Sequence, residues 1–135
     1  MWLSAAPAGE PLAPDEIRLL TELGFVASGA GKLVEAAAIF NGLKAVRPDR
    51  SFVYIGLAVT LLNGGKAAEA AMLLEREGLQ ACPDDPEIRV FLGLALRLSR
   101  RAQESTKVLE SVLTAECSPE IRALAQSLLT TPVVV

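Results

Sequence analysis

The sequence predicts an all-α fold, an α-solenoid of three helix-turn-helix repeats followed by a C-terminal capping helix. Three observations support this prediction. One motif recurs at a nearly constant spacing, apolar residues between its copies follow a helical period, and the composition is 51% hydrophobic with only 4% aromatic residues. With 135 residues and a formal net charge of −3, the chain is expected to form one folded domain and not a disordered segment.

The repeat is clearest at a glycine-lysine pair that is followed by glutamate and alanine. Gly31-Lys32-x-x-Glu35-Ala36-Ala37 recurs 34 residues later from Gly65, and a degraded copy begins 35 residues further on at Arg100. Other positions keep the same shift: Leu23-Gly24 with Leu57-Ala58 and Leu92-Gly93, Phe40 with Leu74 and Leu109, and Ala27 with Leu61 and Leu96. Pro48 and Pro83 lie 35 residues apart, so repeat two holds one extra residue before its proline. Arg100 stands where repeat three should have its turn glycine.

Start and stop signals predict seven helices, at about 15–28, 32–46, 50–63, 66–80, 85–98, 101–115 and 118–129. Three aspartates are expected to cap helices, because their oxygens accept hydrogen bonds from the first amides: Asp15, Asp49 and Asp85. Pro86 and Pro119 suit first helical positions, and Ser118 precedes the second of them.

Glycines are expected to form the tight turns between paired helices, at Gly29, Gly31, Gly64 and Gly65. Small residues should let paired helices approach beside the larger Phe40, Leu74 and Leu109; they are Gly24, Ala36, Ala58, Ala70 and Gly93. The last helix carries Ile121, Leu124 and Leu128 on one face, as a capping helix should.

The folded domain is expected to span residues 15–129, with repeats at about 15–49, 50–84 and 85–118 and the capping helix at 118–129. Residues 1–14 are expected to form a flexible arm, because prolines stand at positions 7, 11 and 14, and residues 130–135 a loose tail. Trp2 is expected to be solvated. The alternative is that it docks into a groove of this chain or of a neighbour.

A period near 34 residues with Leu-Gly, then alanine, an aromatic and proline resembles the tetratricopeptide-repeat (TPR) family over residues 15–118. The resemblance implies that the first helix of each repeat lines a concave groove. The groove positions it nominates are, repeat by repeat, Arg18, Thr21, Phe25 and Ser28; Phe52, Ile55, Val59 and Leu62; and Glu87, Val90, Leu94 and Arg97. Most are apolar, so the groove is expected to be an interaction surface.

The sequence leaves three alternatives for what occupies this groove: a partner peptide, a second copy in a homodimer, and the N-terminal arm. Arginines near the first helices could hold an acidic or C-terminal carboxylate, with simple solvation as the alternative; they are Arg18, Arg50, Arg89, Arg97, Arg100 and Arg101. TPR domains that capture the acidic C-terminus of heat-shock proteins use Lys and Asn where this chain has Thr21 and Phe25, so that clamp is expected to be absent.

Catalysis is not expected. The chain has no histidine, which excludes Ser-His-Asp and Cys-His sites and any His-ligated metal. Cys82 and Cys117 occupy equivalent ends of successive repeats, too far apart for a disulfide, so two free thiols in a reducing compartment are expected. No apolar run is long enough to span a membrane, and 13 basic against 16 acidic residues do not suggest nucleic-acid binding. We expect no metal and no cofactor.

Among small TPR proteins the chain most resembles the cytoplasmic chaperones of bacterial type III secretion, over roughly residues 20–62. The residues that carry this resemblance are Gly31-Lys32, Glu35-Ala36, Ile39-Phe40, Leu43, Pro48-Asp49, Ser51-Phe52 and Gly56-Leu57. It implies a cytoplasmic chaperone or apparatus protein of type III secretion that holds an apolar or helical segment of a secreted subunit in its groove, with a co-chaperone as the other partner considered. The alternative is a structural TPR adaptor, or a homodimeric scaffold unrelated to secretion.

Overall fold

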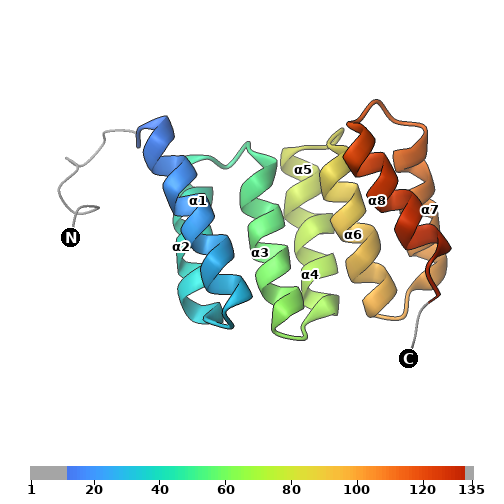
Figure 1. Cartoon of the computed structure of the whole chain (residues 1–135), viewed down its shortest axis with the longest axis horizontal. Helices are drawn as coiled ribbons and strands as arrows, with labels where there is room; N and C mark the ends of the chain where they lie inside the picture. Colours follow the sequence, from blue (N-terminus) through green and yellow to red (C-terminus); the bar gives the residue numbers. More distant parts are fainter. Residues whose placement is uncertain (1–11, 133–135) are drawn as a thin grey trace.

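The computed structural model describes residues 12–132, and this part of the chain contains helices and no strands. The elements are α1 (Pro14–Gly29), α2 (Leu33–Val46), α3 (Ser51–Asn63), α4 (Ala67–Leu73), η2 (Leu74–Gly78), α5 (Leu79–Ala81), α6 (Pro86–Leu98), α7 (Ala102–Leu113) and α8 (Pro119–Thr130). The helices stand side by side as antiparallel pairs in chain order, with α8 closing the C-terminal end (Figure 1). The predicted all-α TPR-type solenoid is therefore confirmed, and Trp2 and most of the predicted arm lie outside the described residues.

The predicted helix boundaries agree with the observed ones to within one or two residues, but two predicted caps are wrong. Asp85 and Ser118 do cap α6 and α8: Asp85 Oδ1 accepts from the Glu87 amide at 2.9 Å and Ser118 Oγ from the Ile121 amide at 3.2 Å. Asp15 instead lies inside α1, because Pro14 takes the first helical position. Asp49 does not cap α3, because this helix begins at Ser51 and Arg50 occupies the capping position.

The turns within the three repeats share one geometry. After α1, α3 and α6 an amide five residues on closes the turn: Lys32 donates to Ala27 O at 2.9 Å, Lys66 to Leu61 O at 2.8 Å and Arg101 to Leu96 O at 2.8 Å. The residue before each donor has a positive φ, 80° at Gly31, 74° at Gly65 and 67° at Arg100. Repeat three thus keeps the left-handed turn although it lacks the glycine that favours it.

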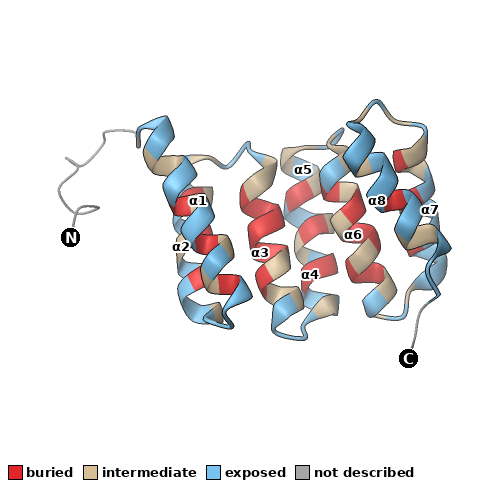
Figure 2. Ribbon diagram, in the orientation of Figure 1, coloured by how far each residue is buried: buried red, intermediate tan, exposed pale blue. Residues whose placement is uncertain are grey.

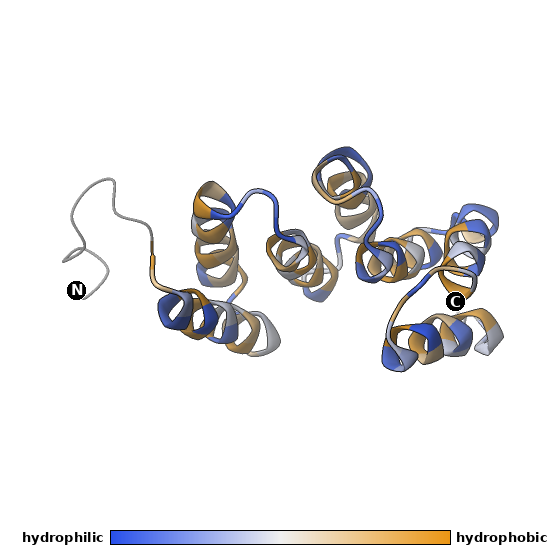
Figure 3. Cartoon of the chain, turned by 90° about the horizontal axis from the view of Figure 1, so that it is seen from above, coloured by the Kyte–Doolittle hydropathy of each residue, from blue (hydrophilic) through white to orange (hydrophobic). Residues whose placement is uncertain are grey.

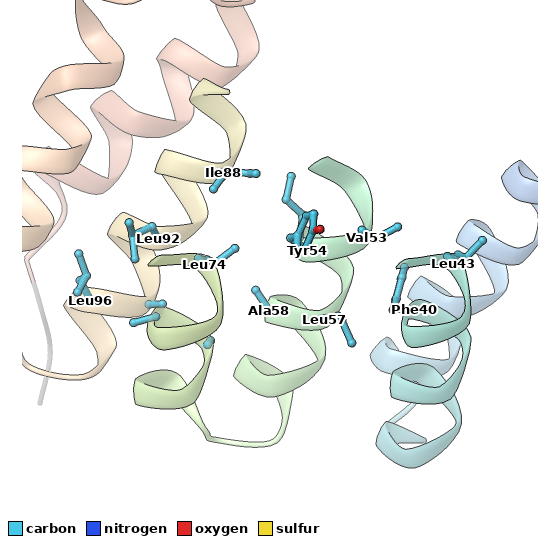
Figure 4. Packing of buried hydrophobic residues seen from close by; sticks show 14 of the residues in the cluster. Phe40, Leu43, Val53, Tyr54, Leu57, Ala58, Leu74, Ile88, Leu92 and Leu96 are labelled. Atoms are coloured by element: carbon cyan, nitrogen blue, oxygen red, sulfur yellow. The ribbon is translucent and has the colours of Figure 1, made fainter. Parts of the chain in front are cut away.

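The extra residue of repeat two appears as a π-helical turn. The second helix of this repeat is α-helical over α4, widens to a π-helix over η2 and returns to a short α-helical turn at α5. An added residue inside a helix is accommodated by such a turn without shifting the residues on either side out of register. Because of this, Tyr54, Leu74 and Ile88 still meet in one core although the repeat is a residue longer (Figure 4).

The core runs along the row of helices. One cluster of buried side chains extends from α1 to α6, and a second, formed by Val90, Leu109, Val112 and Ala125, lies beneath α8. The predicted pairing of small and large residues is confirmed: a Cβ added to Gly24 would lie 2.8 Å from Phe40 Cζ, and one added to Gly93 would lie 2.5 Å from Leu109 Cδ2. Burial is densest in α3, where seven of the 13 residues are buried (Figure 2).

Candidate functional site

Viewed from above, the first helices of the repeats lie along one side of the molecule and the second helices along the other (Figure 3). Helix α8 extends the row formed by the first helices α1, α3 and α6. The two helices at the ends of this row, α1 and α8, project beyond α3 and α6 on the same side. The side formed by α1, α3, α6 and α8 is therefore concave, and we call it the concave face.

Five apolar side chains that the repeat register nominated are half-buried on the first helices. Four of them, Phe25, Phe52, Val59 and Leu62, pack against the main core with part of their surface. Phe25 meets Phe40 edge-on, with 4.9 Å between the ring centroids. Leu94 of α6 is half-buried as well. These five residues leave an apolar strip on the first helices that is only partly covered by the chain itself.

Two nominated residues do not belong to that strip. Ile55 is 4% exposed inside the main core, and Val90 is 1% exposed in the cluster beneath α8. Each side chain is therefore enclosed by the packing of neighbouring helices. The expectation that Ile55 and Val90 line an open groove is corrected accordingly: their contacts are structural.

Most polar residues at the nominated groove positions interact with residues of the same or a neighbouring helix. Arg18 is exposed, 3.8 Å from Asp15 on the same helix, and Thr21 Oγ1 donates to Ile17 O at 2.7 Å. Ser28 is buried and accepts a 2.8 Å hydrogen bond at Oγ from Asn63 Nδ2, which ties α1 to α3. Burial raises the pKa of Glu87, and the nearby Asp85 carboxylate raises it further.

A basic pocket lies at the N-terminal ends of α1 and α3. It has a volume of about 200 Å³ and is lined by Pro14, Ile17, Arg47, Arg50 and Phe52. The Arg47 guanidinium already hydrogen-bonds within the chain, donating to Leu12 O at 3.2 Å and to Val46 O at 2.9 Å, so it is less available to a ligand. The Arg50 guanidinium makes no hydrogen bond or ion pair with any residue between 12 and 132, so it can bind a carboxylate beside the Phe52 ring.

The other arginines differ in their availability. Arg97 lines a second pocket of about 130 Å³ between α6, α7 and α8, together with Leu109, Leu128 and others. Arg101 forms ion pairs with Glu75, at 3.2 Å, and with Glu104. Arg89 donates to Pro83 O at 3.1 Å. Three of these arginines, Arg50, Arg97 and Arg100, therefore line a pocket without a side-chain partner in the described chain; the pocket at Arg100 also includes Arg101 and Glu104.

Both cysteines are free thiols and half-buried. Cys82 Sγ donates to Asp49 O at 3.3 Å, and Cys117 Sγ to Val112 O at 3.7 Å. Burial raises the pKa of Cys82, and the carboxylates of Asp85 and Asp49 raise it further. This thiol is therefore a poor nucleophile at neutral pH.

One exposed apolar surface was not predicted from the sequence. Leu19, Leu23 and Val26 of α1 are 47%, 44% and 68% exposed and follow one another at spacings of four and three residues, so they form a stripe along one side of the helix. The signal was present in the repeat alignment, since these residues match buried positions of repeats two and three. It could be recognised only once the structure showed that no described helix covers this side of α1.

The described chain shows neither a metal-binding cluster nor a membrane-spanning helix. Over residues 12–132, no three or more Cys, Asp or Glu side chains come together in a way that could hold a metal ion. No helix in this range combines the length and apolar character needed to cross a membrane.

Comparisons with known proteins place the fold. No protein-family model matches the sequence, and the search of curated proteins finds no match. Solved structures do match. The type III secretion translocator chaperone SycD of Yersinia enterocolitica gives a TM-score of 0.72 at 18% identity, covering 86% of this chain and 87% of that one.

Two further structures are equally similar. PcrH of Pseudomonas aeruginosa, in complex with the chaperone binding region of PopB, gives 0.72 at 21% identity, covering 87% of this chain and 94% of that one. The Sgt2 TPR domain from Aspergillus fumigatus gives 0.71 at 17% identity, covering 91% and 82%. The protein is thus a TPR-type α-solenoid whose fold resembles that of the type III secretion chaperones along most of its length.

Proposed function

We propose that this protein is a non-catalytic chaperone of type III secretion that holds an apolar or helical segment of a secreted subunit against its concave face. The observation that carries the proposal is the half-buried apolar strip of Phe25, Phe52, Val59, Leu62 and Leu94 beside the pocket that contains Arg50. PcrH, which shares the fold, has been solved with the chaperone binding region of PopB, and SycD with a peptide of the translocator YopD. A held subunit would be kept from assembling in the cytoplasm before export.

The strip by itself supports only weak binding. Covering what remains exposed on five half-buried side chains contributes roughly 1 kcal/mol each, about 4–7 kcal/mol in all. Association costs on the order of 4–15 kcal/mol. A tight complex therefore needs further contacts, and Arg50 offers one, because a charge-assisted bond to a carboxylate is about twice as strong as a neutral hydrogen bond.

The segment that fits is consequently amphipathic. Its apolar side would lie along α1, α3 and α6, and an acidic side chain or a terminal carboxylate would reach the pocket between Pro14 and Phe52. Arg97 at the far end of the strip offers a second cation. A purely apolar segment would leave both guanidinium groups without a partner.

The test is co-expression of the full chain with candidate secreted subunits of a type III system, followed by the mass of the purified complex and its Kd by calorimetry. Leu94→Asp should weaken binding at least about tenfold, since it places a carboxylate in the apolar strip. Met72→Asp is the matched control, because Met72 is 47% exposed on α4, outside the concave face. Equal binding by the two variants would remove the concave face from the mechanism.

A structural TPR adaptor remains the second candidate, favoured by the Sgt2 TPR domain, which fits the chain as well as the chaperones do. The same experiment separates the two. A chaperone is expected to be unstable or aggregation-prone alone and to be rescued by a secreted subunit. A well-behaved homodimer that ignores such subunits would favour the adaptor.

A further inference from the structure

The exposed stripe of α1 is the feature that the proposed function does not use. Leu19, Leu23 and Val26 lie on one side of α1, and Glu22 lies among them. We call these four residues the end face. Five of the eight large hydrophobic residues that are exposed in the described chain belong to α1 and α2, so this end of the solenoid is the more apolar one.

The repeat register shows what such a face is built to contact. The residues equivalent to Leu19, Leu23 and Val26 are Val53, Leu57 and Thr60 in repeat two and Ile88, Leu92 and Ala95 in repeat three. All six are buried, between 0% and 7% exposed. In repeat two they are covered by α2, and in repeat three by α4 and η2, which are the second helices of the preceding repeats. Figure 4 shows Val53 and Leu57 pointing from α3 toward Phe40 and Leu43 of α2.

We propose that the end face binds an amphipathic helix of a second protein, which lies on α1 as α2 lies on α3. Leu19, Leu23 and Val26 have the same spacing as the six buried residues, so a helix placed in this way meets the same kind of surface. The role is independent of the concave face, because the stripe does not include any of the groove positions.

Glu22 specifies the chemistry of that helix. Its equivalent in repeat two is Gly56, and a Cβ at Gly56 would lie 2.2 Å from Cε1 of Phe40. The residue of the bound helix that takes the place of Phe40 therefore faces Glu22. No Lys or Arg of residues 12–132 pairs with Glu22. A lysine or arginine at this point would pack its stem on the stripe and pair with the carboxylate, whereas a phenylalanine would bury the charge.

The same residue disfavours a second copy of this chain. Glu22 is at the middle of α1, which spans Pro14–Gly29, so an antiparallel α1–α1 contact centred on the stripe would bring two Glu22 carboxylates together. A head-to-tail contact would need a free second helix at the other end. There the outer side of α7 is already covered by α8, through Leu109, Val112 and Ala125. A helix from a different protein avoids both problems.

The test uses the full chain and two synthetic peptides with the sequence of α2, held helical by a side-chain lactam on the face away from Phe40. One peptide carries Phe40→Lys and the other Phe40→Glu. The lysine peptide should bind at 1:1 stoichiometry in fluorescence anisotropy. Leu23→Asp in the protein should weaken it at least about tenfold, because a carboxylate would be buried against the apolar side of the peptide. Met72→Asp should leave binding unchanged.

A charge exchange provides the sharper readout. Glu22→Lys should weaken the lysine peptide about tenfold and strengthen the glutamate peptide by a similar factor, since like charges at a contact repel and opposite ones attract. Leu94→Asp on the concave face should change neither. Loss of binding in Leu94→Asp with Leu23→Asp unaffected would show that the peptide binds in the groove, and the proposal would be overturned.

Two other occupants give distinct outcomes. If wild type sediments as a dimer that Leu23→Asp dissociates, a second copy covers the end face and the proposal fails. If the lysine peptide binds only after residues 1–11 are deleted, the chain's own N-terminal segment covers it, and the proposal again fails. Failure of the secreted-subunit experiment would leave all these outcomes unchanged, so the two proposals can be judged separately.

Discussion

Gly56 of α3 lies directly against the ring of Phe40 in α2. A Cβ at position 56 would be 2.2 Å from Cε1 of Phe40, and one at Gly24 of α1 would be 2.8 Å from Cζ of the same ring. Phe40 is fully buried between these two glycines. A single ring thus sets the spacing both within repeat one and between repeats one and two.

Gly56→Ala is expected to destabilise the protein by about 1–3 kcal/mol, because the added methyl forces Phe40 out of a close-packed site. The measurement is urea unfolding followed by circular dichroism. Gly42→Ala is the matched control: it is a helical glycine with nothing within 4 Å of its Cβ position. That change should stabilise by about 0.5–1 kcal/mol through its helix propensity. Equal effects in the two variants would contradict the packing role of Gly56.

Arg100 carries the left-handed turn of repeat three with a φ of 67°. Arg100→Gly is expected to raise the free energy of unfolding by about 1 kcal/mol, because glycine adopts this conformation without the steric cost of a Cβ. Gly65→Ala, at the equivalent turn of repeat two, should lower it by a similar amount. If Arg100→Gly destabilises the protein, the arginine side chain must contribute contacts that outweigh its backbone strain.

Glu104 is held by Arg101 at the start of the same helix. The hydrogen bond from Arg101 lowers the pKa of Glu104. A carboxyl whose pKa is lowered by folding adds stability above its unfolded pKa of about 4.3, and this stability is lost as the pH falls through the folded value. Glu104→Gln should therefore lower the thermal midpoint at pH 7, by an amount that shrinks as the pH falls below the unfolded pKa of about 4.3 and that also shrinks in added salt.

Glu87 should behave in the opposite way. Its pKa is raised by burial first and by Asp85 second, so the charged form is disfavoured in the folded state. The penalty is present above the folded pKa and disappears as the pH falls below the unfolded value of about 4.3. Glu87→Gln is expected to raise the thermal midpoint slightly at pH 7 and not at pH 3. If Glu87→Gln and Glu104→Gln shifted the midpoint in the same direction at pH 7, the opposite environments of the two carboxyls would be refuted.

Cys82 is expected to react slowly with iodoacetamide at pH 8. Burial and the carboxylates of Asp85 and Asp49 raise the pKa of Cys82, and the thiolate is the reactive species. The rate of Cys82 alkylation is measured by mass spectrometry across pH 7–10 in a Cys117→Ser background. The rate should rise steeply on unfolding in urea. Fast alkylation of the folded protein at pH 8 would contradict the assignment.

The repeat register, and with it most of the fold, follows from local patterns in the sequence. The motif from Gly31 and its copy from Gly65 located the turns, and the 35-residue spacing of Pro48 and Pro83 indicated the extra residue that the η2 turn absorbs. Helix periods, turn glycines and first-position prolines are local, so they can be read from neighbouring residues.

Which surfaces are open follows from the packing of the helices against one another. Ile55 and Leu94 were both nominated as groove positions, yet the first is 4% exposed within the main core and the second is half-buried and belongs to the apolar strip. Leu19 and Val53 hold equivalent positions, and one is 47% exposed where the other is fully buried. Exposure depends on which distant helix lies opposite a residue, and that is set by packing between elements and not by the residue's own sequence neighbourhood.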